Sequence, residues 1–164
     1  MPVKAPDFTT LLQGARRTAA HLELRDNYRT TGEAPGVQLI RETAARGVVL
    51  RRARITDEPG ADAATLAASC AAGELVRWLP RTRASGIALP GRDFWLIDTR
   101  LVLFHWYADD GAWAGHHFTG DPGAVRLCSA AFEAVWARAL PHAPDRAGGT
   151  SLGPARSTWE HLHP

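Results

Sequence analysis

The chain has 164 residues, of which 45% are apolar and 22% charged, and this composition is typical of a globular protein with a core of its own. Its formal net charge of +2 argues against a protein whose main task is to coat nucleic acid, because such proteins carry a strong basic excess. No apolar run approaches the ~18 residues of a membrane span. The opening MPVKAPDF lacks the apolar core of a signal peptide, so we expect a cytoplasmic protein.

The basic residues are almost all arginine, with Lys4 as the one lysine among nineteen. Arginine suits buried ion pairs and anion sites because its planar guanidinium can donate two parallel hydrogen bonds to a carboxylate or a phosphate. Codon bias in a GC-rich genome explains the same usage. The two cysteines, Cys70 and Cys128, lie far apart in helix-like stretches, and we expect both to be buried free thiols.

The first third of the chain alternates helix and strand. Asp7 can cap a helix that runs to about Ala20. In the following HLELRDNY, residues 21–28, Leu22 and Leu24 share one face of a strand while His21, Glu23 and Arg25 share the other. After a loop rich in turn formers, the pattern predicts a helix over 37–45 that Gly47 ends.

The rest of the chain continues this alternation. Residues 48–55, VVLRRARI, form a predicted strand with Arg52 and Arg54 on one face. Asp62 can cap the next helix, which Gly73 ends, and a short strand ELVRWLP follows. The remaining predicted elements are a loop over 81–92, a meander of two or three strands over 93–118 with turns at 98–100 and 109–111, and a helix from Asp121 to about Leu140.

This order of elements predicts an α/β (α+β) protein with a single domain over 1–140, in which helices flank a mixed β-sheet. Residues 141–164 read as a Pro/Gly-rich tail that Trp159 can anchor at its end.

Several chemistries have no support in the sequence. His116 and His117 are adjacent in a strand, so they point to opposite faces and do not share a metal ion easily. No serine stands in a GxSxG elbow, and the glycine-rich GGTSLG neither follows a strand nor precedes a lysine, as a phosphate loop would require. We therefore expect no metal, no cofactor and no catalytic triad.

The charged strand faces carry more information. If the strand with Glu23 and Arg25 lies beside the strand with Arg52 and Arg54, four charges meet on the sheet, and at least one arginine should contact Glu23 because buried charges must be paired. Such a cluster is either a structural ion-pair network or the floor of an anion-binding pocket. We expect the following residues to line the site: Glu23, Arg25, Tyr28, Arg52, Arg54, Glu74, Arg77, Trp78, Asp98 and His105.

Four segments together resemble a family. The stretches HLELRDNY, RGVVLRRARITDEP, AAGELVRWLPR and LPGRDFWLIDTRLVLFHW are similar, in order and spacing, to an actinobacterial family catalogued as a domain of unknown function, number 6879. The resemblance covers about Phe8 to Leu140. It implies that the protein works beside a helix-turn-helix regulator, because members of this family tend to be encoded next to such regulators.

A more remote resemblance concerns one half of a phospholipase D-like domain, carried by ARGVVLRRARI and, after the meander, FEAVWARA. That superfamily cleaves phosphodiesters with the motif HxKxxxxD. If its aspartate is matched to Asp98, Gly91 stands at the histidine position and Asp93 at the lysine position. The resemblance therefore implies the architecture without the chemistry.

The leading hypothesis is a non-catalytic regulatory module that binds a small anionic ligand, a helix-turn-helix regulator, or both, with no direct DNA binding and no membrane contact. The second hypothesis is a small enzyme, of secondary metabolism for example, that uses His105 or Asp98 as an acid/base group. The third is a purely structural partner-binding protein without a pocket.

Overall fold

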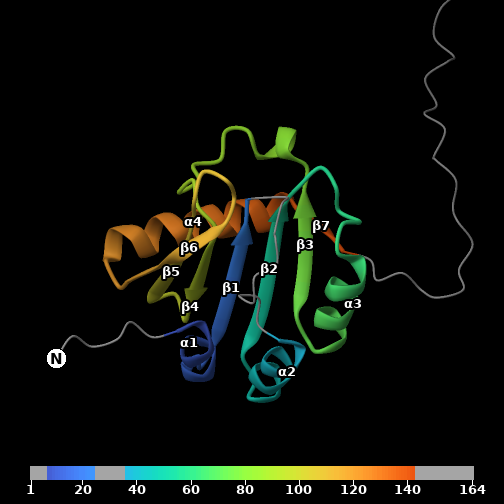
Figure 1. The fold of residues 1–164 in the computed structure, drawn as a ribbon, viewed down its shortest axis with the longest axis vertical. Helices are drawn as coiled ribbons and strands as arrows, with labels where there is room; N and C mark the ends of the chain where they lie inside the picture. The colour runs from blue at the N-terminus through green and yellow to red at the C-terminus, as the bar shows by residue number, and fades with distance from the viewer. Residues whose placement is uncertain (1–6, 25–35, 143–164) are drawn as a thin grey trace, which may run out of the picture.

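The computed structural model describes residues 7–24 and 36–142. Within these ranges seven strands form one sheet in the order β6-β5-β4-β1-β2-β3-β7 (Figure 1). The strands are β1 (Thr18–Glu23), β2 (Val49–Ile55), β3 (Leu75–Leu79), β4 (Phe94–Ile97), β5 (Leu101–Tyr107), β6 (Trp113–Thr119) and β7 (Leu140–Pro141). The helices are α1 (Phe8–Gly14), α2 (Val37–Ala45), α3 (Ala63–Ala71), a 3₁₀ turn (Arg81–Ala84) and α4 (Pro122–Arg138).

The sheet is mixed, as the element order predicted. Strands β1, β2 and β3 are parallel, and α2 and α3 supply the crossovers between them. The meander β4-β5-β6 and the short β7 pair antiparallel with their neighbours. The single α/β domain with a mixed sheet and flanking helices is confirmed. None of the helices within the described ranges is long and apolar enough to cross a membrane.

Two apolar layers sandwich the sheet. On the back face, α4 packs against the strands through an apolar stripe that includes buried Cys128, Phe132 and Val135. On the front face, α1 and α2 cover the amino-terminal halves of the parallel strands with Leu12 and Ile40. Figure 1 shows α4 crossing behind the strands, and α1 and α2 gathered at the end where β1 and β2 begin. The carboxyl-terminal halves of β1 and β2 therefore extend beyond the front helices.

Three local predictions need correction. The first helix ends at Gly14 rather than near Ala20, because residues from Thr18 onward form β1, which pairs with a strand on each side. Asp62 precedes α3 but its side chain accepts no capping hydrogen bond, since its backbone is left-handed with φ of 60°. Cys70 is partly exposed, whereas Cys128 is a buried free thiol as expected.

The end of the described chain also differs from the predicted tail. Leu140 and Pro141 form β7, which pairs with Trp78 and Arg77, and His142 donates its backbone N–H to the Val76 carbonyl. The other predicted tail residues, 143–164 with Trp159, lie outside the described residues.

Asp98 holds the amino-terminal end of β1 in place. It occupies the tight turn between β4 and β5, where both Asp98 and Thr99 have positive φ values of 51° and 56°. Its carboxylate accepts hydrogen bonds from the backbone N–H groups of Arg16, Arg17 and Thr18, at 2.7 to 3.2 Å. Burial alone would raise the pKa of Asp98, but the bonds from Thr18, Arg17 and Arg16 outweigh it and hold the pKa below its ordinary value.

We expect Asp98→Ala to lower the free energy of unfolding by about 2 kcal/mol, because it removes three charge-assisted hydrogen bonds and places alanine at positive φ. Asp98→Asn should cost less, since asparagine keeps one acceptor oxygen and tolerates this backbone. Thr99→Gly should stabilise the fold, because glycine relieves the strain of a β-branched residue at positive φ. Urea unfolding of the three variants measures this order, and an Asp98→Ala variant as stable as the wild type would contradict it.

Candidate functional site

The register of β1 and β2 places the predicted charges side by side. His21 lies opposite Arg52, and Glu23 lies opposite Arg54, all on the front face of the sheet. This confirms that the strand of Arg52 and Arg54 is the neighbour of the strand of Glu23. Glu74, just before β3, completes the set. We refer to Glu23, Arg52, Arg54 and Glu74 as the charged layer.

Each member of the charged layer is paired. Arg52 donates two hydrogen bonds to Glu74, from Nε at 2.7 Å and from Nη2 at 3.1 Å. The Nη1 atom of Arg52 lies 3.4 Å from Glu23 Oε1, and Arg54 Nε donates to Glu23 Oε2 at 3.1 Å. Alternating charges thus run from Glu74 through Arg52 and Glu23 to Arg54. With both glutamates ionised their formal charges cancel, which makes burial of all four tolerable.

Burial changes the acidity of the layer. The pKa of Glu74 is raised above its ordinary value because desolvation disfavours the carboxylate, although the ion pair with Arg52 opposes this. The pKa of His21 is lowered well below its ordinary value, first by burial and then by the positive charges of Arg52 and Arg54 and by His105. His21 is therefore neutral at pH 7.

The rings of His21, Trp95, His105 and His116 border the charged layer on the β4 side, and we refer to them as the aromatic wall. The His21 ring stacks on the Trp95 ring with centroids 4.3 Å apart. The centroid of the His105 ring lies 5.9 Å from that of His21 and 5.3 Å from that of His116. Burial, and then the neighbouring His116, lower the pKa of His105 to about 4. Both histidine rings therefore present one donor and one acceptor nitrogen at neutral pH rather than a charge.

Four buried nitrogen atoms in this region have no hydrogen-bond partner among the residues that the structure describes. They are His21 Nδ1, Arg54 Nη1, and Nδ1 and Nε2 of His105. All three residues are more than nine-tenths buried. Buried polar atoms are normally satisfied, because an unsatisfied one costs about 1–3 kcal/mol. Four such atoms on the front face of the sheet are typical of a binding site whose polar groups form hydrogen bonds with a ligand.

Comparison with family models gives a decisive match. The model described as "Domain of unknown function (DUF6879)" matches residues 34–144. The chain belongs to this family. The predicted resemblance to domain-of-unknown-function family 6879 is thereby confirmed. No curated protein matches the DUF6879 chain.

The DUF6879 chain resembles solved structures in fold, including that of an archaeal chromatin protein. That structure is described as "Structure of TrmBL2, an archaeal chromatin protein, shows a novel mode of DNA binding", and the match has a TM-score of 0.54 at 16% sequence identity. The match covers 82% of this chain and 49% of the TrmBL2 chain, so the DUF6879 chain spans about half the length of that protein. At this identity the likeness concerns the fold alone.

The structure brings most of the predicted site residues together, but not all. Trp78 lies opposite Arg54 on the front face and is partly buried, so it borders the charged layer as expected. His105 joins the aromatic wall. Arg25 and Tyr28 lie outside the described residues.

Arg77 and Asp98 are corrections. Arg77 points to the back face, where its guanidinium stacks over Trp136 at 4.3 Å and Nη1 donates to the Trp136 carbonyl at 3.0 Å. The physical reason is the strand period of two, which separates residue 77 from residues 74 and 78. Asp98 lies at the amino-terminal end of β1, at the opposite end of that strand from Glu23.

Sequence reasoning missed His21 and Trp95 as parts of the site. The alternation of β1 places His21 on the face of Glu23, and this signal was available. Trp95 reaches His21 only through the antiparallel register of β1 and β4, which a single sequence does not display.

Gly91 and Asp93, which stand at the nucleophile and lysine positions of the phospholipase D-like motif, have structural explanations. Gly91 adopts φ of 75°, which favours glycine. Asp93 is buried, and its Oδ1 accepts the backbone N–H of Leu24 at 2.8 Å, beyond the end of β1. Asp93 thus fastens the carboxyl end of β1 to the start of β4.

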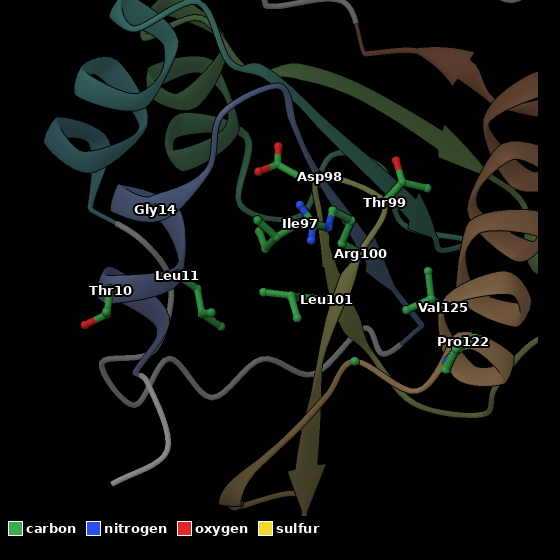
Figure 2. A pocket seen from close by; sticks show the side chains of 11 residues that line it. Thr10, Leu11, Gly14, Ile97, Asp98, Thr99, Arg100, Leu101, Pro122 and Val125 are labelled. Atoms are coloured by element: carbon green, nitrogen blue, oxygen red, sulfur yellow. The ribbon is translucent and has the colours of Figure 1, made fainter. Parts of the chain in front are cut away.

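A cavity of about 680 Å³ opens at the other end of the sheet, between α1, the β4–β5 turn and the start of α4 (Figure 2). Asp98 borders it, and no residue of the charged layer does. The charged layer therefore does not form the floor of this cavity, and its four side chains are buried elsewhere in the structure. Within the described ranges, no group of three or more His, Cys, Asp or Glu is arranged to hold a metal ion.

We expect the protein to lose stability as the pH falls from about 7 towards 4. The pKa of His105 is about 4 in the folded state and near 6.5 in the unfolded chain, so the unfolded state binds more protons in this window. His105 alone should cost about 2 kcal/mol between pH 7 and pH 5. His21 acts in the same direction.

His105→Phe should flatten this dependence, because phenylalanine fills the aromatic wall and does not titrate. His117→Phe, at an exposed position on the other face of the sheet, is the matched control for the replacement of a histidine by phenylalanine. The measurement is urea unfolding at stepped pH values. An equal slope in the wild type and His105→Phe would show that His105 does not bear the acid sensitivity.

Proposed function

We propose that this DUF6879 chain is a non-catalytic regulatory module that binds a small ligand with an anionic group at the charged layer and acts through a DNA-binding partner. The observation that carries the proposal is the set of four buried nitrogen atoms without hydrogen-bond partners on His21, Arg54 and His105. A ligand with one anionic group and further hydrogen-bonding groups would satisfy them.

The location supports this proposal. Glu23, Arg54 and Trp78 stand at or near the carboxyl ends of three parallel strands, beyond the helices that cover the front face. In open α/β sheets ligands bind outside the carboxyl ends of the strands, where the connections leave a crevice.

Arg54 would receive the anionic group. Its Nε is already engaged by Glu23, whereas Nη1 is buried and has no hydrogen-bond partner among the described residues. A bound monoanion changes the net formal charge of the layer from zero to minus one. This added negative charge favours protonation of His21, which the positive charges of Arg52 and Arg54 otherwise oppose. Ligand binding would therefore take up a proton and strengthen as the pH falls.

The partner part of the proposal draws on the fold neighbour. About half of TrmBL2, a DNA-binding chromatin protein, has this fold. The net charge of +2 gives this chain itself little electrostatic attraction for duplex DNA. We propose that a helix-turn-helix regulator supplies the DNA contact and that both proteins are cytoplasmic. The phospholipase D-like half-domain remains a prediction that fits a sensor without phosphodiesterase chemistry.

The enzyme hypothesis finds less support. His105 is neutral at pH 7 with a pKa of about 4, so it is a poor general acid there. The Asp98 carboxylate is occupied by three backbone donors. His21 Nδ1 lies 3.5 Å from Glu23 Oε1, beyond the ~3 Å expected for an activated pair.

The structural-partner hypothesis requires a contiguous exposed apolar patch. The exposed large apolar side chains of the described residues come from five different elements, namely Val49, Leu75, Trp106, Leu127 and Leu140. A protein that only presents an apolar surface has no use for the buried unpartnered nitrogen atoms of His21, Arg54 and His105, and this favours the regulatory module.

A ligand-induced thermal shift tests the proposal. We expect at least one of succinate, benzoate and phosphate to raise the melting temperature of the wild-type protein in proportion to the logarithm of its concentration, and more strongly at pH 6 than at pH 8. Arg54→Met should abolish the shift. Arg51→Met is the matched control, because Arg51 lies on the opposite face of the same strand, paired with Glu133.

An equal shift in Arg54→Met would remove the charged layer as the site, and no shift with any of the three anions would count against an anionic ligand. Tight, sequence-specific binding of duplex DNA by the isolated chain would contradict a role through a separate DNA-binding partner.

A further inference from the structure

The cavity at the amino-terminal end of the sheet combines an apolar interior with one cationic side chain. Leu11 of α1, Ile97 and Leu101 of the β4–β5 hairpin, and Val125 of α4 supply the apolar lining. Thr10, Thr99 and Arg100 supply polar groups at its border, and all three are exposed. A volume of about 680 Å³ lies within the range of small-molecule sites.

Arg100 is the cation of this cavity. Figure 2 shows its nitrogen atoms between Asp98 and Leu101, with α1 on one side and α4 on the other. No ion pair involves the Arg100 side chain in the part of the chain that the structure describes. The guanidinium is therefore available to an acceptor from outside.

The neighbouring acids do not neutralise Arg100 by direct contact. The Asp98 carboxylate is held by the backbone N–H groups of residues 16–18, and Asp121 caps α4 by accepting the N–H of Ala124 at 2.9 Å. Pro122, at the first turn of the 17-residue α4, also lines the cavity, so the partial positive charge of that helix end lies at the same opening. Among the described residues, the Arg100 guanidinium then has no ion-pair partner at this opening, and it suits an anionic group.

We propose that this cavity binds an amphipathic monoanion, namely a medium-length aliphatic carboxylate whose chain lies against Leu11, Ile97, Leu101 and Val125 and whose carboxylate pairs with Arg100. The lining holds one guanidinium and one carboxylate, and because the Asp98 carboxylate is already bound by backbone N–H groups, Arg100 is left to pair with one negative charge of a ligand. The hydroxyl group of Thr99 offers a further hydrogen bond at the rim, whereas that of Thr10 already donates to Asp7 Oδ1 at 2.7 Å. The inference is independent of the charged layer, which lies at the other end of β1.

Isothermal titration calorimetry with decanoate, below its micelle concentration, tests the proposal on the full chain. We expect one decanoate per protein chain, and decan-1-ol, of the same length without the charge, should bind at least about tenfold more weakly. Arg100→Gln should weaken decanoate binding by at least about tenfold and leave decan-1-ol binding unchanged. Arg83→Gln, at an exposed arginine of the 3₁₀ turn outside the cavity, is the matched control.

Gly14→Phe gives a steric test. Gly14 lines the cavity, its φ is not in the left-handed region, and a Cβ built there meets no atom within 4 Å, so the variant should fold with an unchanged melting temperature. The phenyl ring should obstruct the opening and abolish decanoate binding. Binding unaffected by Gly14→Phe, undiminished in Arg100→Gln, or equal for decanoate and decan-1-ol would each overturn the proposal, as would no binding at all.

Neither result depends on the ligand of the charged layer. Arg54→Met should bind decanoate as the wild type does, and Arg100→Gln should respond to succinate, benzoate and phosphate as the wild type does. Loss of decanoate binding in Arg54→Met would assign the anion to the charged layer and overturn the cavity proposal alone.

Discussion

The parallel pairing of β1 with β2 is the constraint on which the rest of the site depends. It sets Glu23 opposite Arg54 and His21 opposite Arg52, so that each buried charge has an opposite charge within reach. A slip of one residue would turn either strand's charges to the back face, into the apolar layer under α4, where they would have no such partners. The strand register therefore determines which charges pair. Because unpaired buried ions are costly, the need to pair all four favours this one alignment of β1 and β2.

The same front face changes character along its length. Near the start of β1 and β2 it is apolar, with Ala19 and Leu50 packed under α1 and α2, and near the end it carries the charged layer and the aromatic wall. Asp98 fastens the apolar end by binding the backbone of residues 16–18, and Asp93 fastens the polar end by binding Leu24. These two aspartates fix the ends of β1, so the spacing between the charged layer and the cavity beside Arg100 is set by one rigid strand. Both carboxylates orient the backbone through these hydrogen bonds.

Much of the fold and part of the site could be predicted from local patterns. The period of two in HLEL and VVLRRARI separated the charged faces from the apolar faces, and the prediction that these strands are neighbours followed from the need to pair Glu23 with an arginine. Arg77 was assigned to the wrong face although the same period excludes it. Two placements depend on strand pairings that a single sequence does not encode locally. Trp95 reaches His21 through the pairing of β4 with β1, and His105 reaches His21 through the further pairing of β5 with β4. The first helix was predicted too long because the side chains of residues up to Ala20 are compatible with a helix. In the structure, residues from Thr18 onward pair with β2 instead.

The central claim is that the Glu23–Arg54 pair is retained for binding rather than for stability. The most direct measurement is the free energy of unfolding of the single variants Glu23→Leu and Arg54→Met and of the double variant, each with and without the anion that shifts the wild type. Removing one partner should cost about 3 kcal/mol, whereas the apolar double variant should be as stable as the wild type and should no longer respond to the anion. A double variant that loses as much stability as the two single variants combined would contradict the claim and make the charged layer a structural network.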